Sequence, residues 1–316
     1  MSDKKVIAVM GATGAQGGGL ARAILEDKTA AFAVRALTRN PKSDKARALA
    51  DRGADVVAVD VDQPQSVEEA FAGAHGAFCV TFFWEHFSPQ KELAHAQAMA
   101  DAAKSNKLKH VIWSTLEDTR KWIPLDDDRM PTLMDHYKVP HFDAKGEANM
   151  LFTDAGVPTT FLLTAFYWDN FIYFGMGPKP GPDGVLSITL PMGDKELSGI
   201  AAQDIGRCAF GIFKAGDEYI GKTVGIAGGH LTGQDMADAL TRALGRDVRY
   251  NAVTPAEYRA FGFDGAEDLG NMFQFKQEFN EDYCGARDLA LSKSLNPTLQ
   301  TFDEWLIANK SNIPIE

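Results

Sequence analysis

Cysteine is scarce in this sequence. Only Cys79, Cys208 and Cys284 occur among the 316 residues, and no two of them have the C-x-x-C spacing. An odd number of widely separated thiols excludes a disulfide framework and a zinc knuckle, and it is typical of a reducing compartment. We therefore expect three small, buried, reduced side chains and no metal site.

Long hydrophobic runs and an excess of positive charge are also absent. The longest apolar runs, such as residues 78–84, are far shorter than the roughly 18 residues of a membrane-spanning helix. The apolar stretch at residues 6–10 is too short for a signal peptide. A formal net charge of -11 argues against a nucleic-acid surface, which needs a basic patch. We predict a folded, cytoplasmic protein that binds neither nucleic acid directly nor a membrane.

What the sequence does contain is a regular alternation of strands and helices. Helical patterns at 43–52, 65–74 and 88–105 separate the apolar, β-rich runs. These runs lie at residues 6–10, 33–37, 55–59, 77–81, 110–114 and 159–164. Strands that alternate with crossover helices predict an α/β protein, specifically a Rossmann doubly wound parallel sheet.

The pattern changes after residue 165. Residues 174–184 are rich in Gly and Pro, and residues 185–192 resemble a strand of a hairpin. TVGIAG (223–228), a helix that begins near Thr232 and residues 246–253 then predict strand, helix and strand. We predict a NAD(P)-binding Rossmann domain at 1–165 and a smaller α/β lobe at 166–316 for a substrate or partner, with TVGIAG in the lobe. This division allows the chain to return to the Rossmann sheet within the second span.

A glycine-rich loop follows the first predicted strand directly. Residues 11–17 read GATGAQG, with G-x-x-G-x-x-G spacing, and a helical pattern begins at once behind them. Glycines there permit a tight turn and bring backbone N–H groups and a helix N-terminus close to a pyrophosphate. We predict a dinucleotide site. Its loop contacts would be Gly11, Thr13, Gly14, Ala15, Gln16 and Gly17.

The second predicted strand ends in basic residues instead of an acid. A site selective for NAD usually places Asp or Glu at this tip, whereas Thr38, Arg39 and Lys42 stand here. A guanidinium suits the 2'-phosphate of NADP, so the tip favours NADP(H) as cofactor, the alternative being a solvated basic loop. At the tip of the third strand, Asp60 and Val61 are predicted adenine contacts. A capping or turn role for Asp62 is equally open.

With these motifs the chain resembles the NmrA-like family of atypical short-chain dehydrogenases. Besides GATGAQG, the resemblance rests on LTRNP (37–41), DVD (60–62), HFDAKGE (141–147), YWDN (167–170), AQDIG (202–206) and LQTFDEWL (299–306). It implies a Rossmann fold that binds NADPH or NADP+, with Tyr167 and Asn170 near the cofactor. The family includes NADPH-dependent reductases and NADP-binding redox sensors or transcriptional regulators that act through protein partners.

The tyrosine of the dehydrogenase Tyr-x-x-x-Lys pair is missing. The matching segment places His141 four residues before Lys145, and no tyrosine of the chain has Lys four residues later. Lys145 is expected to hold the nicotinamide ribose, the alternative being a solvated helix charge. His141 is either a proton donor, since imidazole titrates near neutral pH, or an ordinary loop histidine after Pro140. Ser114 stands where the dehydrogenases have their hydroxyl, although strand-tip serines also cap turns.

Two further segments face the predicted crevice. Thr81 and Phe82 follow the fourth strand, and ligands of such sheets bind beyond the carboxyl ends of the strands. The aromatic cluster at 166–174 is either a substrate or partner surface or part of the core. Because the proton-donating tyrosine is replaced, the sequence favours a redox sensor that responds to NADPH and NADP+. The alternative is an NADPH-dependent reductase of a quinone, enone or carbonyl, with Lys145, His141 and Ser114 at its site.

Overall fold

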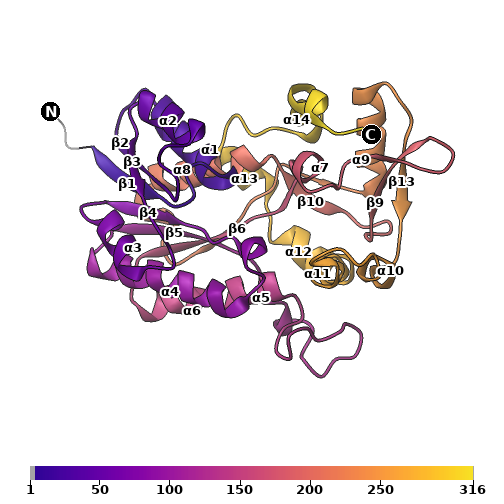
Figure 1. Ribbon diagram of the computed structural model, residues 1–316, viewed down its shortest axis with the longest axis horizontal. Helices are drawn as coiled ribbons and strands as arrows, with labels where there is room; N and C mark the ends of the chain where they lie inside the picture. The colour runs from indigo at the N-terminus through magenta and orange to yellow at the C-terminus, as the bar shows by residue number, and fades with distance from the viewer. Residues whose placement is uncertain (1–3, 316) are drawn as a thin grey trace.

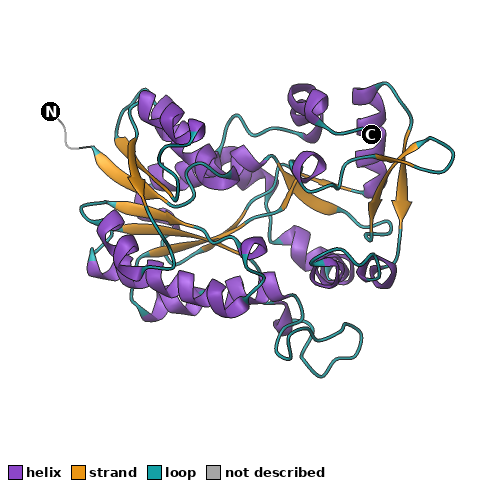
Figure 2. Ribbon diagram, in the orientation of Figure 1, coloured by secondary structure: helices purple, strands orange, loops and turns teal. Residues whose placement is uncertain are grey.

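A seven-stranded parallel sheet forms the larger half of the molecule (Figures 1 and 2). The computed structural model describes residues 4–315. The strand order is β11-β6-β5-β4-β1-β2-β3, and every neighbouring pair is parallel. Its strands are β1 (Lys5–Val9), β2 (Phe32–Thr38), β3 (Asp55–Ala58), β4 (Gly76–Cys79), β5 (His110–Thr115), β6 (Thr159–Leu163) and β11 (Thr223–Gly225). The predicted Rossmann fold is therefore confirmed.

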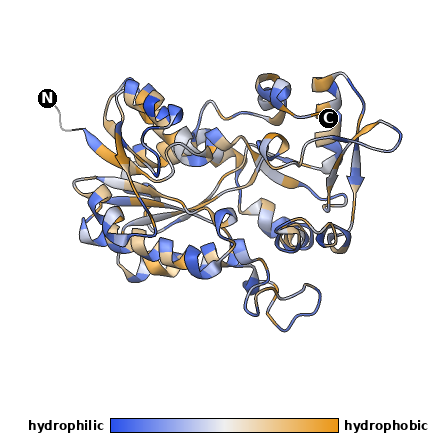
Figure 3. Cartoon of the chain, viewed as in Figure 1, coloured by the Kyte–Doolittle hydropathy of each residue, from blue (hydrophilic) through white to orange (hydrophobic). Residues whose placement is uncertain are grey.

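Helices cover both faces of this sheet, as its nearly continuous apolar strands require (Figure 1). One face packs against α1 (Ala15–Glu26), α2 (Asp44–Asp51), α8 (Ala202–Lys214) and α13 (Leu289–Leu295). The other packs against α3 (Pro64–Phe71), α4 (Pro89–Ser105), α5 (Pro140–Glu147) and α6 (Asn149–Asp154). Hydrophobic and hydrophilic residues alternate along these helices, which is the pattern of elements with one buried side (Figure 3).

Helices α1 and α8 touch backbone to backbone. A Cβ atom at Gly19 would collide with the Gln203 carbonyl, and one at Gly206 would collide with the Leu20 amide. Only glycine permits this approach, so the helix behind the glycine loop is supported by a helix from the second half of the chain.

The smaller lobe contains two three-stranded sheets, β12-β10-β7 and β13-β9-β8. Their strands are β7 (Phe166–Tyr167), β8 (Lys179–Pro180), β9 (Leu186–Leu190), β10 (Leu197–Ile200), β12 (Gly229–Leu231) and β13 (Val248–Ala252). The helices are α7 (Asn170–Tyr173), α9 (Gly233–Leu244), α10 (Pro255–Arg259), α11 (Ala266–Glu278), α12 (Asn280–Gly285) and α14 (Phe302–Asn309). Short 3-10 turns lie along both halves of the molecule, at η1 (Phe83–Glu85), η2 (Thr119–Lys121), η3 (Gly216–Tyr219) and η4 (Lys310–Asn312).

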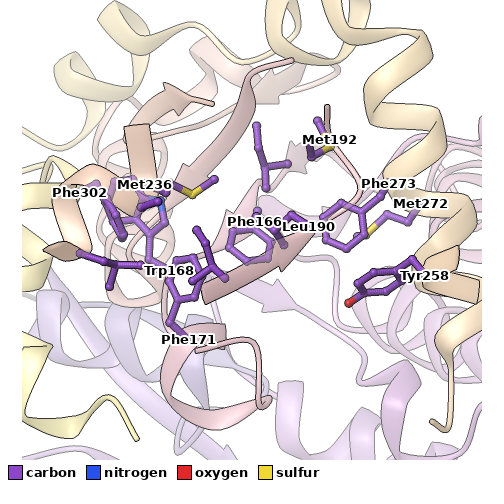
Figure 4. Packing of buried hydrophobic residues seen from close by; sticks show 14 of the residues in the cluster. Phe166, Trp168, Phe171, Leu190, Met192, Met236, Tyr258, Met272, Phe273 and Phe302 are labelled. Carbon is purple, nitrogen blue, oxygen red and sulfur yellow. The ribbon is translucent and has the colours of Figure 1, made fainter. Parts of the chain in front are cut away.

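The aromatic cluster at 166–174 divides between core and surface. Phe166, Trp168 and Phe171 are buried in the lobe core (Figure 4), whereas Tyr173 and Phe174 are exposed by 73% and 56%. The core interpretation therefore holds for these three residues, and a substrate or partner role for the two exposed rings stays a prediction.

One placement predicted from the sequence is wrong. The strand in TVGIAG was assigned to the smaller lobe, but β11 pairs with β6 at the edge of the large sheet. The chain thus returns to the Rossmann sheet through α8 and β11, and the boundary at residue 165 stays a prediction. The hairpin is confirmed, since β8 and β9 pair antiparallel. Within residues 4–315, no helix has the length and apolar character needed to cross a membrane.

Candidate functional site

A cavity of about 1680 Å³ extends from the carboxyl ends of β1, β2 and β4 into the smaller lobe. The glycine loop and the tips of these strands line one end, which we call the crevice end. Residues of α5, α10, α11 and α12 line the other end, which we call the lobe end. Ligand sites for one small molecule have volumes of roughly 300–1,000 Å³. The cavity therefore has room for a dinucleotide and a second ligand.

The glycine loop is shaped by close backbone contacts. Gly11 has φ +63°, which favours glycine, and a Cβ atom at Gly17 would lie 2.5 Å from the Met10 carbonyl oxygen. Gly14 caps α1 without a side chain, so no side chain satisfies the first N–H groups of this helix. All six predicted loop contacts line the cavity. The loop therefore fits the pyrophosphate of a dinucleotide.

The basic strand tip only partly matches its prediction. Thr38 and Arg39 line the cavity, and Arg39 forms an exposed ion pair of 2.5 Å with Glu85 of η1. Lys42 is exposed and does not line the cavity, whereas Lys45 does. Arg39 is thus the better-placed partner for a 2'-phosphate, although a phosphate there would compete with Glu85.

The tip of β3 combines a cavity position with a turn. Asp60 and Val61 line the crevice end. The Asp60 carboxylate accepts a hydrogen bond of 3.1 Å from the Asp62 amide, and Asp62 lies 2.9 Å from the His95 ring. The local turn role is therefore present together with the position expected for an adenine contact.

Gln16, at the start of α1, is hydrogen-bonded to side chains of β5 and β7. Its amide donates to the Tyr167 hydroxyl at 2.5 Å, and its carbonyl oxygen accepts from the Ser114 hydroxyl at 2.8 Å. Burial raises the pKa of Tyr167 to about 12, so its phenol stays neutral. Tyr167 and Asn170 line the cavity, but Ser114 does not. The structure thus makes Ser114 a positioning partner of Gln16.

Lys145 lies in a buried ionic cluster. Its Nζ is 2.5 Å from Glu92 Oε1 and 2.5 Å from Thr81 Oγ1, and it also contacts the Thr81 carbonyl at 3.3 Å. Burial acts to raise the pKa of Glu92, but the Lys145 ammonium and the hydrogen bonds outweigh burial and lower it to about 2. Three contacts occupy the three donors of the ammonium. To bind a ribose, Lys145 would have to release one of them, and the contact at 3.3 Å is the weakest.

His141 forms a second buried polar pair. Its Nδ1 lies 2.6 Å from Asp268 Oδ1, across 127 residues of sequence, and both side chains are 7% exposed. The ring packs 4.7 Å from Trp84 between centroids and lines the cavity. An Nδ1–H that donates to Asp268 leaves Nε2 as the ring nitrogen for another partner. His141 is therefore a core histidine that is also oriented by a carboxylate, which the loop interpretation did not anticipate.

Sequence reasoning missed several groups of this site. Glu92, Asp268, Lys276 and Tyr283 were not predicted, yet each is buried. A signal exists for Glu92, which lies on the buried and largely apolar side of α4. The buried side of α11 carries several polar residues, so Lys276 gives no such signal. Phe82, predicted beside Thr81, lines the cavity and is 52% exposed. No group of three or more potential metal ligands occurs within residues 4–315.

Sequence comparison places nearly the whole chain in one family of proteins. The model of the NmrA-like family matches residues 3–306. An NmrA-like family domain-containing oxidoreductase, ptmS of Penicillium ochrochloron, is 27% identical over 343 residues, which covers 96% of this chain and 97% of that protein.

Structural comparison gives the same fold. NmrA, described as a negative transcriptional regulator, superposes with a TM-score of 0.78 at 25% identity over 96% of this chain and 95% of that one. NmrA has also been crystallised in complex with NADP. A triphenylmethane reductase of Citrobacter sp., complexed with NADP(H), has a TM-score of 0.72 at 19% identity over 96% and 99% of the two chains. A regulator and a reductase thus share this architecture.

Proposed function

The chain belongs to the NmrA-like family, and from this premise we propose that it is an NADPH-dependent reductase of a quinone, enone or carbonyl compound. The observation that carries the proposal is the continuity of the cavity. Its crevice end suits a dinucleotide, and its lobe end adds a second compartment lined by His141 and aromatic side chains. A protein that only bound the cofactor would not need that compartment.

Three features at the crevice end support NADP(H) as the cofactor. The uncapped N-terminus of α1 suits the pyrophosphate, Arg39 offers a guanidinium to the 2'-phosphate, and no acid stands at the tip of β2. When bound, the nicotinamide would supply a hydride to the substrate.

His141 is the proposed proton donor. A substrate that accepts a hydride at carbon also needs a proton at oxygen or at the neighbouring carbon. An Nδ1–H that donates to Asp268 fixes the orientation of the ring, and the proton would pass to the substrate from Nε2–H. Lys145 would orient the ribose after exchanging its contact with the Thr81 carbonyl.

A redox sensor is the second candidate, and one observation favours it. The segment 83–88 is joined to the crevice by the Arg39–Glu85 pair and by His86, whose Nε2 lies 3.4 Å from Glu92. A cofactor that engaged Arg39 or Lys145 would change the restraints on this segment. NADPH and NADP+ would have to bind the two arrangements with different affinities for the segment to report redox state.

Turnover separates the two candidates. We expect the purified chain to oxidise NADPH in the presence of at least one quinone, enone or aldehyde of a chemically diverse panel, and to bind NADPH more tightly than NADH. Tight NADPH binding without oxidation of the cofactor across the panel would contradict the reductase. Protection from proteolysis at 83–88 that differs between NADPH and NADP+ would then support the sensor.

The role of His141 has its own test. His141→Asn should lower kcat by roughly 100- to 10,000-fold, because proton transfer by a positioned side chain contributes about that much. Asp268→Asn should lower kcat by a smaller factor. His136→Asn is the matched control, since His136 is exposed and its side chain makes no hydrogen bond within residues 4–315. Unchanged kcat in His141→Asn would remove this residue from the mechanism.

A further inference from the structure

Lys276 is a buried cation at the lobe end of the cavity. It lies on α11, is 2% exposed and lines the cavity. Its Nζ contacts the sulfur of Met272 at 3.3 Å and lies 5.1 Å from the centre of the Tyr283 ring. Two more rings, those of Phe142 and Phe273, have their centres at 5.3 and 5.5 Å. The ammonium therefore sits in an aromatic cage, where ring faces stabilise a positive charge only in part.

The charges around Lys276 do not balance. Within residues 4–315 no carboxylate forms an ion pair with it. The nearby Glu117 is already bound by Arg287, through contacts of 2.6 and 3.1 Å. Burial raises the pKa of the Cys284 thiol, so this group is neutral. Two buried cations thus share one carboxylate, and the surroundings favour an added anion.

Tyr283 presents a second unsatisfied group. Its side chain, on α12, is 1% exposed and lines the same cavity, and its hydroxyl has no hydrogen-bond partner in the described part of the chain. Buried polar atoms are nearly always paired, so an orphan hydroxyl beside a cavity indicates a missing partner. Burial also raises the pKa of this phenol, so it remains a hydrogen-bond donor.

Much of the remaining lining of the lobe end is apolar and aromatic, beside the polar Lys179, Ser187, Thr189 and Asp264. Tyr258 and Met272 lie next to Phe273 at this side of the lobe core (Figure 4). Phe174, Phe261 and Phe263 line the cavity nearer the surface and are 56%, 50% and 43% exposed. Such walls suit a flat hydrophobic body better than a sugar or a short polar metabolite.

We propose that Lys276 and Tyr283 bind the oxygen anion, carboxylate or phenolate, of an aromatic ligand whose rings lie against the aromatic walls of the lobe end. The inference rests on the proposed function in taking this ligand as the substrate, and it narrows the substrate class to aromatic quinones, enones or carbonyl compounds that also carry a carboxylate or phenolate. It does not depend on which residue donates a proton during reduction.

Proton linkage supports the assignment. Burial, together with the nearby Arg287 and against the opposing effect of Glu117, lowers the pKa of Lys276 to about 7. An anion next to Nζ favours the charged amine, so binding should take up a proton above about pH 7. Affinity for the anion should then fall as pH rises from 6 to 9. The other charged or titratable groups that line the cavity from the smaller lobe and α5 are Lys179 of β8, Tyr258 of α10, Asp264, Tyr283 of α12, and His141 and Lys145 of α5. Asp268 of α11 and Cys284 of α12 are not among the lining residues.

The test is equilibrium binding to the full chain saturated with NADP+, where no reduction can occur. The probes are 2-naphthoate, ionised 2,4-dinitrophenol and the neutral 2-naphthamide, followed by calorimetry. Naphthoate should bind at least about tenfold more tightly than naphthamide, and its affinity should decline from pH 6 to 9. A comparable preference for dinitrophenolate would extend the ligand class to phenolates, whereas naphthoate alone would restrict it to carboxylates.

Variants assign the effect to the two residues. Lys276→Met should weaken naphthoate about tenfold, abolish its pH dependence and leave naphthamide within about twofold. Tyr283→Phe should weaken naphthoate about threefold or more. Lys310→Met, at an exposed lysine, is the control, and thermal melts verify that each variant is folded. Since methionine suits an apolar cage, Lys276→Met is expected to fold.

Equal binding of naphthoate and naphthamide by the wild type, or unchanged naphthoate binding by Lys276→Met, would overturn this inference. Selective anion binding without any NADPH oxidation would uphold it and contradict only the reductase. Reduction of neutral compounds without selective anion binding would do the reverse.

Discussion

The two ends of the cavity differ in the kind of residues that line them. At the crevice end, the glycine loop from Gly11 to Gly17 contributes backbone and small side chains from one continuous stretch of chain, beside the tips of β2, β3 and β4. The lobe end consists of large side chains, and its polar pairs, His141 with Asp268 and Glu117 with Arg287, join residues 127 and 170 positions apart. We infer that the glycine loop is sensitive chiefly to added volume, whereas the lobe end is sensitive chiefly to the loss of a buried charge.

The largest expected effect is loss of the Glu117 carboxylate at the lobe end. Glu117→Gln leaves the fully buried Arg287 without its counter-ion, so the free energy of unfolding should fall by about 3–5 kcal/mol in chemical denaturation. The control is Asp303→Asn, which breaks a pair with Arg242 that is more than 60% exposed on both sides and should cost under about 1 kcal/mol. Equal losses in the two variants would show that burial of the charge is not decisive.

The second largest expected effect is the loss of stability in acid that the buried Glu92 carboxylate, the partner of Lys145, confers. Its pKa is about 2 in the folded protein, below the ordinary 4.5, so its contribution is complete above pH 4.5 and disappears as pH falls toward 2. That contribution is about 3 kcal/mol. Glu92→Gln should therefore flatten the acid limb of stability measured by denaturant titration from pH 6 to 3. The exposed Glu68→Gln should retain the limb of the wild type.

An added methyl group should disturb the crevice end. Gly17→Ala places a Cβ atom 2.5 Å from the Met10 carbonyl oxygen and should cost about 1–3 kcal/mol of stability, with at least tenfold weaker NADPH binding. Gly285→Ala is the matched change, because nothing lies within 4 Å of the new atom. Calorimetric titration and thermal unfolding measure both quantities. Unaltered NADPH affinity in Gly17→Ala would mean that the cofactor does not bind against this loop.

The smallest effect concerns charge at the crevice end. Arg39→Ala should weaken NADPH about tenfold and leave NADH nearly unchanged, because only NADPH carries the 2'-phosphate. Lys42→Ala should alter neither affinity beyond about twofold, since Lys42 does not line the cavity. A larger loss in Lys42→Ala than in Arg39→Ala would reverse the assignment of the two residues.

The difference between the two ends also explains what could be predicted from sequence. The strands of the large sheet and the loop from Gly11 to Gly17 were predictable, because their signals are local runs and spacings. The edge strand in TVGIAG was misplaced, since its partner β6 lies about 60 residues earlier and no local pattern encodes that pairing.

Local sequence patterns also could not predict which side chains pair with each other in the folded protein. The matched HFDAKGE segment identified His141 and Lys145, yet their partners Asp268 and Glu92 come from other helices. Ser114 was predicted in a catalytic role from its strand-tip position, while its hydrogen bond to Gln16 depends on the folded loop. Lys276 could not be identified from a local pattern, because its aromatic cage forms only in the folded lobe.

The glycine contact between α1 and α8 bears on how the protein is made. During synthesis, α1 and the glycine loop leave the ribosome nearly 190 residues before α8, and β6 remains an open sheet edge until β11 appears. A nascent chain that ends before residue 202 therefore lacks both the support behind the cofactor loop and the strand that closes the sheet. Cofactor binding and a complete sheet thus become available late in translation, in the same stretch of synthesis.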